Sequence, residues 1–106
     1  MLNDFAKKWV EALRSGKYAQ TKRQLAYGES YCCLGVACEL AIDSGIISSY
    51  ESTDNGLPEE VQNALGLRFS IGVYGKNTSL AGINDKGATF NEIADIIESE
   101  PGGLFV

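Results

Sequence analysis

The sequence of 106 residues contains no histidine, two prolines, one tryptophan and one methionine. Without histidine, the usual activation of a serine or cysteine nucleophile by an imidazole is excluded. The longest apolar run, Cys32–Cys38, has seven residues, whereas a membrane-spanning helix needs ~20. Charged residues interrupt the N-terminal segment every few positions, unlike the continuous apolar stretch of a signal peptide. We therefore predict a cytoplasmic protein with no membrane partner.

Positive charge is also scarce, because nine lysines and arginines stand against fourteen acidic residues and give a net charge of −5. Six of the nine basic residues precede residue 24, and twelve of the fourteen acids lie from Glu29 onward. An acidic chain is a poor general binder of nucleic acid, so such a partner is not expected. The basic N-terminal part can still bind a single phosphate or carboxylate.

The length and composition predict one compact domain over residues 1–106, without repeats or linkers. Apolar periodicity and capping residues predict helices at about 3–14, 33–43 and 57–65, and one that starts after Thr89. The second helix is apolar on most sides and is expected at the centre of the domain. A hairpin is predicted over 20–33, around the turn at 27–30, and a strand over 68–75. The fold class is therefore α+β, dominated by helices, with a small antiparallel sheet.

The most distinctive stretch is YCCLGVAC, residues 31–38, with its three cysteines. Structural zinc needs four ligands, usually in paired spacings, and this chain offers three cysteines and no histidine. Neighbouring apolar residues raise the pKa of a buried thiol, which disfavours a nucleophile or a redox site. We predict that the cysteines are buried small hydrophobic residues, with no metal and no cofactor. A metal site and a reactive thiol remain the alternatives.

Paired carboxylates are another route to catalysis, since general acid–base chemistry needs only two acids in different environments. Glu39 and Asp43 lie one turn apart on the predicted central helix and are the best such pair. Gly35 lies on the same stripe of that helix and is expected to allow close approach of a neighbouring backbone. A solvated or hydrogen-bonded helix edge is the competing interpretation of the two acids.

The segment GKYAQTKRQLAYG, residues 16–28, is the predicted binding surface. An arginine can form paired hydrogen bonds to a phosphate, and a tyrosine can stack on a base. The mixture suits a nucleotide-like anion, although a solvated hairpin with routine lysines is the alternative. A second candidate anion-binding segment is LAGINDKGATF, residues 80–90, because free backbone amides at the start of the last helix can receive an anion. The alternative is a simple turn that leads into the cap at Thr89. The predicted ligand-binding residues are Lys17, Tyr18, Lys22, Arg23 and Tyr27.

Several motifs resemble a known group of sequences. They are W-V-x-A-L-R-S-G-x-Y, Y-C-C-L-G-V-A-C-E-L-A, L-P-E-E-V-Q and L-A-x-I-N-D-x-G-x-T-F-x-E-I-A-x-I-I-E. They resemble a family of small uncharacterised proteins of tailed phages and some bacteria, over most of the chain except 43–56 and 67–78. This family has no established activity, so the resemblance carries no catalytic residues over to this chain. It implies a phage-borne accessory protein in the cytoplasm of the host cell.

The leading hypothesis is a non-enzymatic accessory protein that sequesters a nucleotide-like anion, for example a signal used in host defence. The alternative is an inhibitor or adaptor that binds a host protein through its acidic surface. A small hydrolase that uses Glu39 and Asp43 is the third hypothesis. A homo-oligomer is left open, because single exposed hydrophobic residues are normal on monomers.

Overall fold

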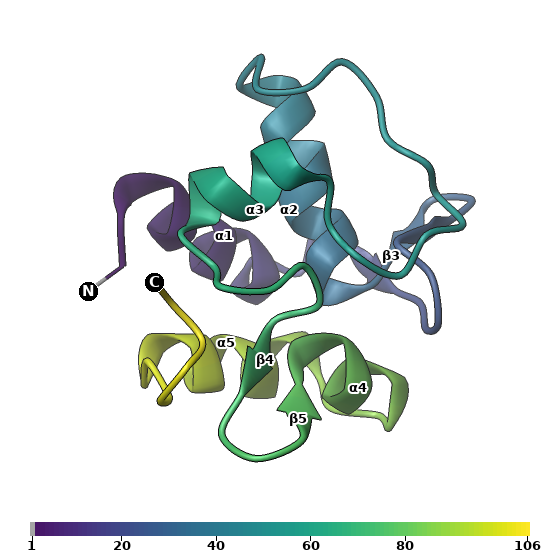
Figure 1. The fold of residues 1–106 in the computed structure, drawn as a ribbon. Helices are drawn as coiled ribbons and strands as arrows, with labels where there is room; N and C mark the ends of the chain where they lie inside the picture. Colours follow the sequence, from purple (N-terminus) through teal and green to yellow (C-terminus); the bar gives the residue numbers. More distant parts are fainter. Residues whose placement is uncertain (1) are drawn as a thin grey trace.

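The computed structural model describes residues 2–106 and confirms the α+β class (Figure 1). The helices of the described chain are α1 (Asp4–Arg14), α2 (Cys33–Asp43), α3 (Glu59–Leu65), α4 (Leu80–Asp85) and α5 (Phe90–Glu98). The strands are β1 (Ala19–Gln20), β2 (Ala26–Tyr27), β3 (Ser30–Tyr31), β4 (Val73–Tyr74) and β5 (Thr78–Ser79). None of the helices within 2–106 is long and apolar enough to cross a membrane.

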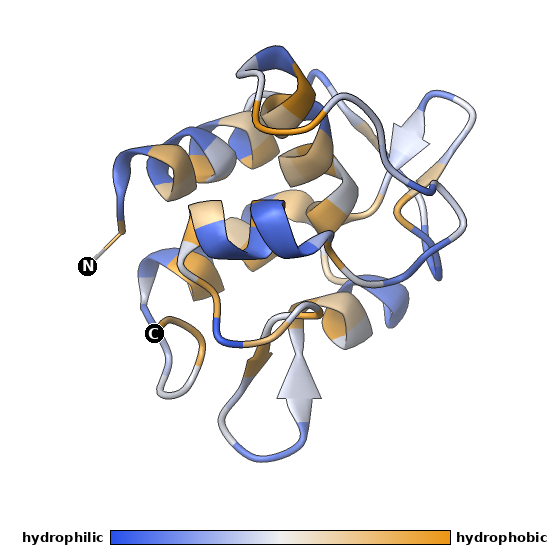
Figure 2. Ribbon diagram, turned by 45° about the horizontal axis from the view of Figure 1, so that its top comes forward, coloured by the Kyte–Doolittle hydropathy of each residue, from blue (hydrophilic) through white to orange (hydrophobic). Residues whose placement is uncertain are grey.

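The terminal helices start where the sequence predicts. The Asn3 side chain accepts a hydrogen bond from the backbone N–H of Ala6 and caps α1. Thr89 caps α5 as predicted, and together with Glu92 it forms a capping box. Helices α1 and α5 pack against each other. In Figure 2, hydrophobic and hydrophilic residues alternate along α1 and α3. Helices α1 and α3 therefore each contribute an apolar face to the core and leave the opposite face in water.

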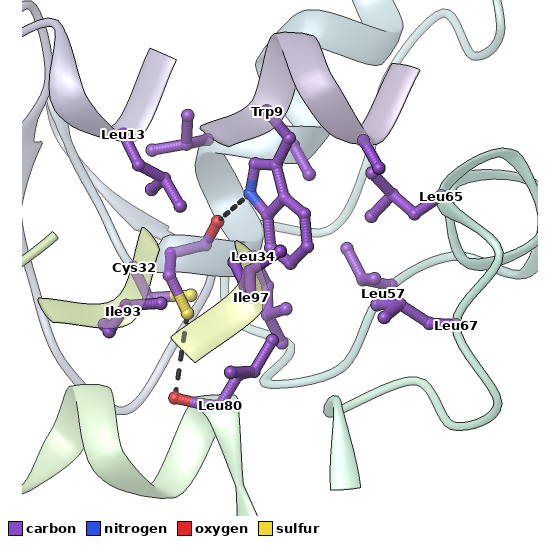
Figure 3. Close-up of a cluster of buried hydrophobic side chains, with 14 of the residues drawn as sticks. Trp9, Leu13, Cys32, Leu34, Leu57, Leu65, Leu67, Leu80, Ile93 and Ile97 are labelled. Carbon is purple, nitrogen blue, oxygen red and sulfur yellow. Dashed lines mark hydrogen bonds between the residues drawn. The ribbon is translucent and has the colours of Figure 1, made fainter. Parts of the chain in front are cut away.

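Helix α2 occupies the centre, as predicted, and its residues Cys33 to Cys38 are all buried. Trp9 of α1 is fully buried against it, and its indole N–H donates to the carbonyl oxygen of Cys33 at 2.8 Å (Figure 3). Gly35 meets the preceding loop so closely that an added Cβ atom would lie 1.9 Å from the carbonyl oxygen of Leu25. The expected close approach of a backbone at Gly35 is confirmed.

The first sheet has the order β1-β3-β2, and it is mixed rather than purely antiparallel. Strands β2 and β3 form the predicted hairpin, whose turn contains Gly28 with a φ of +60°. Strand β1 pairs with β3 in parallel, which the hairpin prediction missed. Each strand has only two residues, so the segment between Gln20 and Ala26 is a loop and not the first arm of a long hairpin.

The predicted strand at 68–75 is wrong over most of its length. Only Val73–Tyr74 is a strand, and it pairs with β5. The preceding residues form a turn that ends at Gly72. Its N–H donates to the carbonyl oxygen of Phe69, and its φ is +72°. Close packing against Leu80 leaves no room for a side chain at position 72, so the turn at this position requires glycine.

Two further differences concern helix boundaries. A short helix, α4, forms where only a turn was predicted, and the Ser79 side chain caps it by accepting from the N–H of Gly82. Helix α3 begins at Glu59, two residues after the predicted start, and Pro58 is the residue that precedes it. The C-terminal residues fold back onto the body, with Leu104 fully buried and the N–H of Val106 bonded to the carbonyl oxygen of Gly66.

Candidate functional site

The three cysteines are interior residues, as predicted. Cys33 and Cys38 are 0% exposed, Cys32 is 4% exposed, and none forms a disulfide. The Cys32 sulfur caps α2 by accepting from the N–H of Gly35. Burial raises the pKa of all three thiols, that of Cys38 to about 12. Because the thiolate is the nucleophilic form, these thiols are poorly suited to react in the folded protein.

Glu39 and Asp43 differ in their surroundings. The Tyr50 hydroxyl donates to Oε2 of the half-buried Glu39 at 2.7 Å, whereas Asp43 is exposed. Burial and this hydrogen bond both raise the pKa of Tyr50. Glu39 is thus hydrogen-bonded and Asp43 is solvated, which agrees with the interpretation of the two acids as the polar edge of α2. Within residues 2–106 there is no group of three or more cysteine, aspartate or glutamate residues that could hold a metal ion.

The structure divides the five predicted binding residues into two groups. Lys17 and Tyr18 line an open hollow of about 300 Å³ between α1 and Leu40 of α2. Tyr27 lies near the turn of the β2–β3 hairpin, toward the same end of the sheet, and is 72% exposed. Lys22 and Arg23 follow β1 and lie beyond the opposite end. The structure does not bring all five side chains to one surface.

The hollow beside Tyr18 is a poor place for an anion. The ring of Tyr18 meets that of Tyr31 edge to face, with centroids 5.6 Å apart. Burial raises the pKa of Tyr18, and the negative charges of Asp43 and Glu39 raise it further. Glu11 lines the hollow together with Lys17, so an anionic ligand there would be repelled by this carboxylate as well as by Asp43 and Glu39.

Lys22 and Arg23 belong to the segment Thr21–Gln24, here called the basic loop. Its backbone is fixed by bonds to other parts of the chain. The N–H of Thr21 donates to Tyr31, and the N–H of Arg23 donates to Oδ1 of Asp85 at 2.7 Å. Immediately after the loop, the N–H of Leu25 donates to the carbonyl oxygen of Asp54 at 2.7 Å. The loop therefore has a defined shape while both basic side chains are exposed.

Asn84 of α4 holds this arrangement together, a role that was not predicted from the sequence. It is the only fully buried polar residue of the described chain. Its Oδ1 accepts from Gln20 Nε2 at 2.8 Å and from the N–H of Cys33 at 3.1 Å. Its Nδ2 donates to the carbonyl oxygen of Thr21 at 2.8 Å. The four-residue spacing of Leu80 and Asn84 on one helix face was the available signal.

The comparisons with known proteins concern the first part of the chain. The family model described as "Domain of unknown function (DUF8296)" matches residues 1–62, which is more than half of the sequence. The chain belongs to this family. No curated protein and no solved structure matched the chain.

The DUF8296 segment contains α1, the first sheet, the basic loop and α2. The two side chains of α4 that hold the loop, Asn84 and Asp85, lie outside that segment. Helix α5, which packs on α1, also lies outside it. In this DUF8296 protein, the matched segment therefore depends on residues after 62 both for its core and for the shape of its basic loop.

Proposed function

We propose that this DUF8296 protein acts by non-enzymatic binding and that its basic loop grips a small nucleotide-like anion. The observation that carries the proposal is the fixed loop backbone around two exposed basic residues. Within residues 2–106, neither Lys22 nor Arg23 forms an ion pair, so both charges remain available. A loop that is already ordered loses less conformational entropy when its ligand binds.

The backbone of Arg23 supports the same proposal. Its φ of +70° lies in the left-handed region, which costs a residue with a side chain roughly 1–2 kcal/mol. The bond from its N–H to Asp85 helps to maintain this conformation. Backbone strain of this kind is concentrated at ligand-binding and catalytic sites. An arginine in this position is thus consistent with a role that outweighs its cost to folding.

Binding without conversion fits the state of the groups best suited to chemistry. The thiols are buried and their pKa values are raised. Glu39 is engaged by Tyr50. Both groups contribute to the packing and hydrogen bonding of α2. The proposed activity therefore rests on the basic loop and not on the cysteine-rich helix.

The resemblance to phage proteins supplies the proposed setting. A small accessory protein in the host cytoplasm would sequester a nucleotide signal of host defence, and sequestration requires affinity without turnover. The rival proposal is an inhibitor or adaptor that engages a host protein through the acidic surface. A stoichiometric protein partner, recovered from host lysate together with a lack of nucleotide binding, would favour the rival.

Calorimetry at low salt against a panel of cyclic and linear nucleotides tests the proposal. A charge-assisted hydrogen bond contributes about 1.5–3 kcal/mol, so Arg23→Ala should weaken binding about tenfold or more. Lys22→Ala should weaken it as well. Lys76→Ala is the matched control, because Lys76 is an exposed lysine in the β4–β5 hairpin and its removal should leave binding unchanged. Absence of heat with every nucleotide, or full binding by Arg23→Ala, would refute the proposal.

A further inference from the structure

We propose that Asp85 makes the basic loop selective for a phosphate ester with adjacent hydroxyl groups, such as a nucleoside monophosphate, over inorganic phosphate. This inference rests on the proposed function, because it concerns the ligand of the same loop. It adds a second recognition element, a carboxylate that accepts hydrogen bonds from the ligand, to the two cationic donors.

The geometry at Asp85 leaves half of its carboxylate available. Oδ1 accepts the N–H of Arg23 at 2.7 Å. Oδ2 is bonded to the same carbon and so lies beside the same loop, and it has no hydrogen-bond partner within residues 2–106. Asp85 is the last residue of α4 and is half-buried. The adjacent Asn84, which is fully buried and bonded to three other segments, fixes the end of this helix.

A free carboxylate oxygen changes which anion the loop prefers. It repels a bare phosphate that approaches Lys22 and Arg23, because like charges in proximity are unfavourable. It accepts a hydrogen bond from a neutral hydroxyl, and bonds to charged groups are the stronger ones. A ligand that combines a phosphate with a nearby sugar hydroxyl satisfies both the cations and the carboxylate. Inorganic phosphate has no neutral hydroxyl apart from the charged group itself, so it reaches Oδ2 only by bringing its own negative charge against the carboxylate.

Calorimetry with three probes tests this selectivity on the full chain. The probes are adenosine 5′-monophosphate, its 2′,3′-dideoxy form and inorganic phosphate. The unaltered protein should bind adenosine monophosphate about tenfold or more tightly than either of the others, the difference expected when a hydrogen bond to a charged group is lost. Equal affinity for the nucleotide and its dideoxy form would overturn the inference without any variant.

The substitution Asp85→Asn sharpens the test. The amide oxygen can still accept the N–H of Arg23, while an NH₂ donor replaces Oδ2 and the negative charge is removed. We expect tighter binding of inorganic phosphate, weaker binding of adenosine monophosphate, and hence loss of the tenfold preference. Asp54→Asn is the matched control, because Asp54 is exposed and contacts the residue after the loop through its backbone oxygen. It should leave the preference unchanged.

The possible failures are distinguishable. Binding of anions without a preference, or a preference that Asp85→Asn does not alter, overturns the role of Asp85 and leaves the anion-binding proposal standing. An absence of binding by all three probes and by the wider nucleotide panel overturns both. Far-ultraviolet circular dichroism of each variant establishes that it is folded, and the dideoxy comparison remains decisive if Asp85→Asn does not fold.

Discussion

The first turn of α2 and the basic loop lie side by side but differ in nearly every physical property. The N–H of Cys32 donates to the carbonyl oxygen of Leu25, directly after the loop. Cys33 and its neighbours in α2 are fully buried, whereas Lys22 and Arg23 are exposed. The cysteine run is the more distinctive sequence, yet its side chains are packing residues. Distinctive composition here marks the interior, and the ordinary-looking loop carries the available charge.

One side chain connects the two regions. Asn84 accepts from the N–H of Cys33 at the start of α2 and donates to the carbonyl oxygen of Thr21 in the basic loop. Asn84 of α4 therefore fixes the position of the surface loop relative to the start of the interior helix. Substitutions can separate the two roles, since those in α2 should affect folding and those in the loop should affect binding.

The largest effect is expected from Gly35→Ala. The added Cβ atom would lie 1.9 Å from the carbonyl oxygen of Leu25 and 2.8 Å from its carbonyl carbon, so α2 and the backbone at Leu25 must move apart. We expect a loss of about 3 kcal/mol in the free energy of unfolding, measured by urea denaturation. Gly102→Ala is the control, because an added Cβ there meets nothing within 4 Å. Equal stability of the two variants would contradict the close contact.

Asn84→Ala should have the next largest effect. It removes the acceptor of the Cys33 N–H and the donor to Thr21, and it leaves a buried backbone N–H unpaired. The expected loss is about 2 kcal/mol of unfolding free energy. Hydrogen exchange should also accelerate at Cys33 more than at Val10 of α1, which Asn84 does not contact. Unchanged protection at Cys33 would show that Asn84 does not anchor the start of α2.

The buried thiols predict a loss of stability in alkali. The pKa of Cys38 is raised from its ordinary value of 9.0 to about 12, so the unfolded chain releases this proton first. Its stabilising contribution is complete below about pH 9 and is lost as the pH rises toward about 12. By about pH 10 the loss from this thiol is about 1 kcal/mol.

The tyrosines Tyr18, Tyr31 and Tyr50 also have raised pKa values and act in the same direction. Urea midpoints at about pH 8 and pH 10 measure the effect. Cys38→Ala should show a smaller fall between the two pH values than the unaltered protein. A rapid reaction of any thiol with an alkylating reagent in the folded state would contradict their burial.

The smallest effect on folding should come from Arg23→Gly, and it should be opposite in sign. Glycine relieves the left-handed strain of roughly 1–2 kcal/mol. Its greater freedom in the unfolded chain, however, destabilises the folded state by about 0.5–1 kcal/mol. A net gain of about 0.5 kcal/mol is expected, together with weaker nucleotide binding. Lys22→Gly is the control, because Lys22 does not have a positive φ and gains no such relief. Destabilisation by Arg23→Gly would argue against strain at this position.

The sequence predicted the elements whose signals are local. The caps of α1 and α5, the buried α2 and the turn at Gly28 follow from side chains within a few residues of each other. The parallel β1–β3 pair was not predictable in this way, because the basic loop and β2 separate the two strands in the sequence. Short strands carry too little alternation to reveal their pairing.

The candidate site was only partly predictable. Lys22 and Arg23 were identified by their charge, and their exposure agrees with that expectation. The positions of Tyr18 and Tyr27 toward the other end of the sheet depend on strand register, which composition does not encode. The contributions of Asn84 and Asp85 come from more than 60 residues away in the sequence. Contacts at that separation become visible only when the chain is folded.

Mapping the binding surface by nuclear magnetic resonance tests the central claim most directly. In a titration of the full chain with adenosine 5′-monophosphate, the backbone amide signals of Thr21–Gln24 and Asp85 should move progressively. The signals of Cys33–Cys38 should stay in place. Shifts centred on the cysteine-bearing helix, with the signals of Thr21–Gln24 unmoved, would contradict the account.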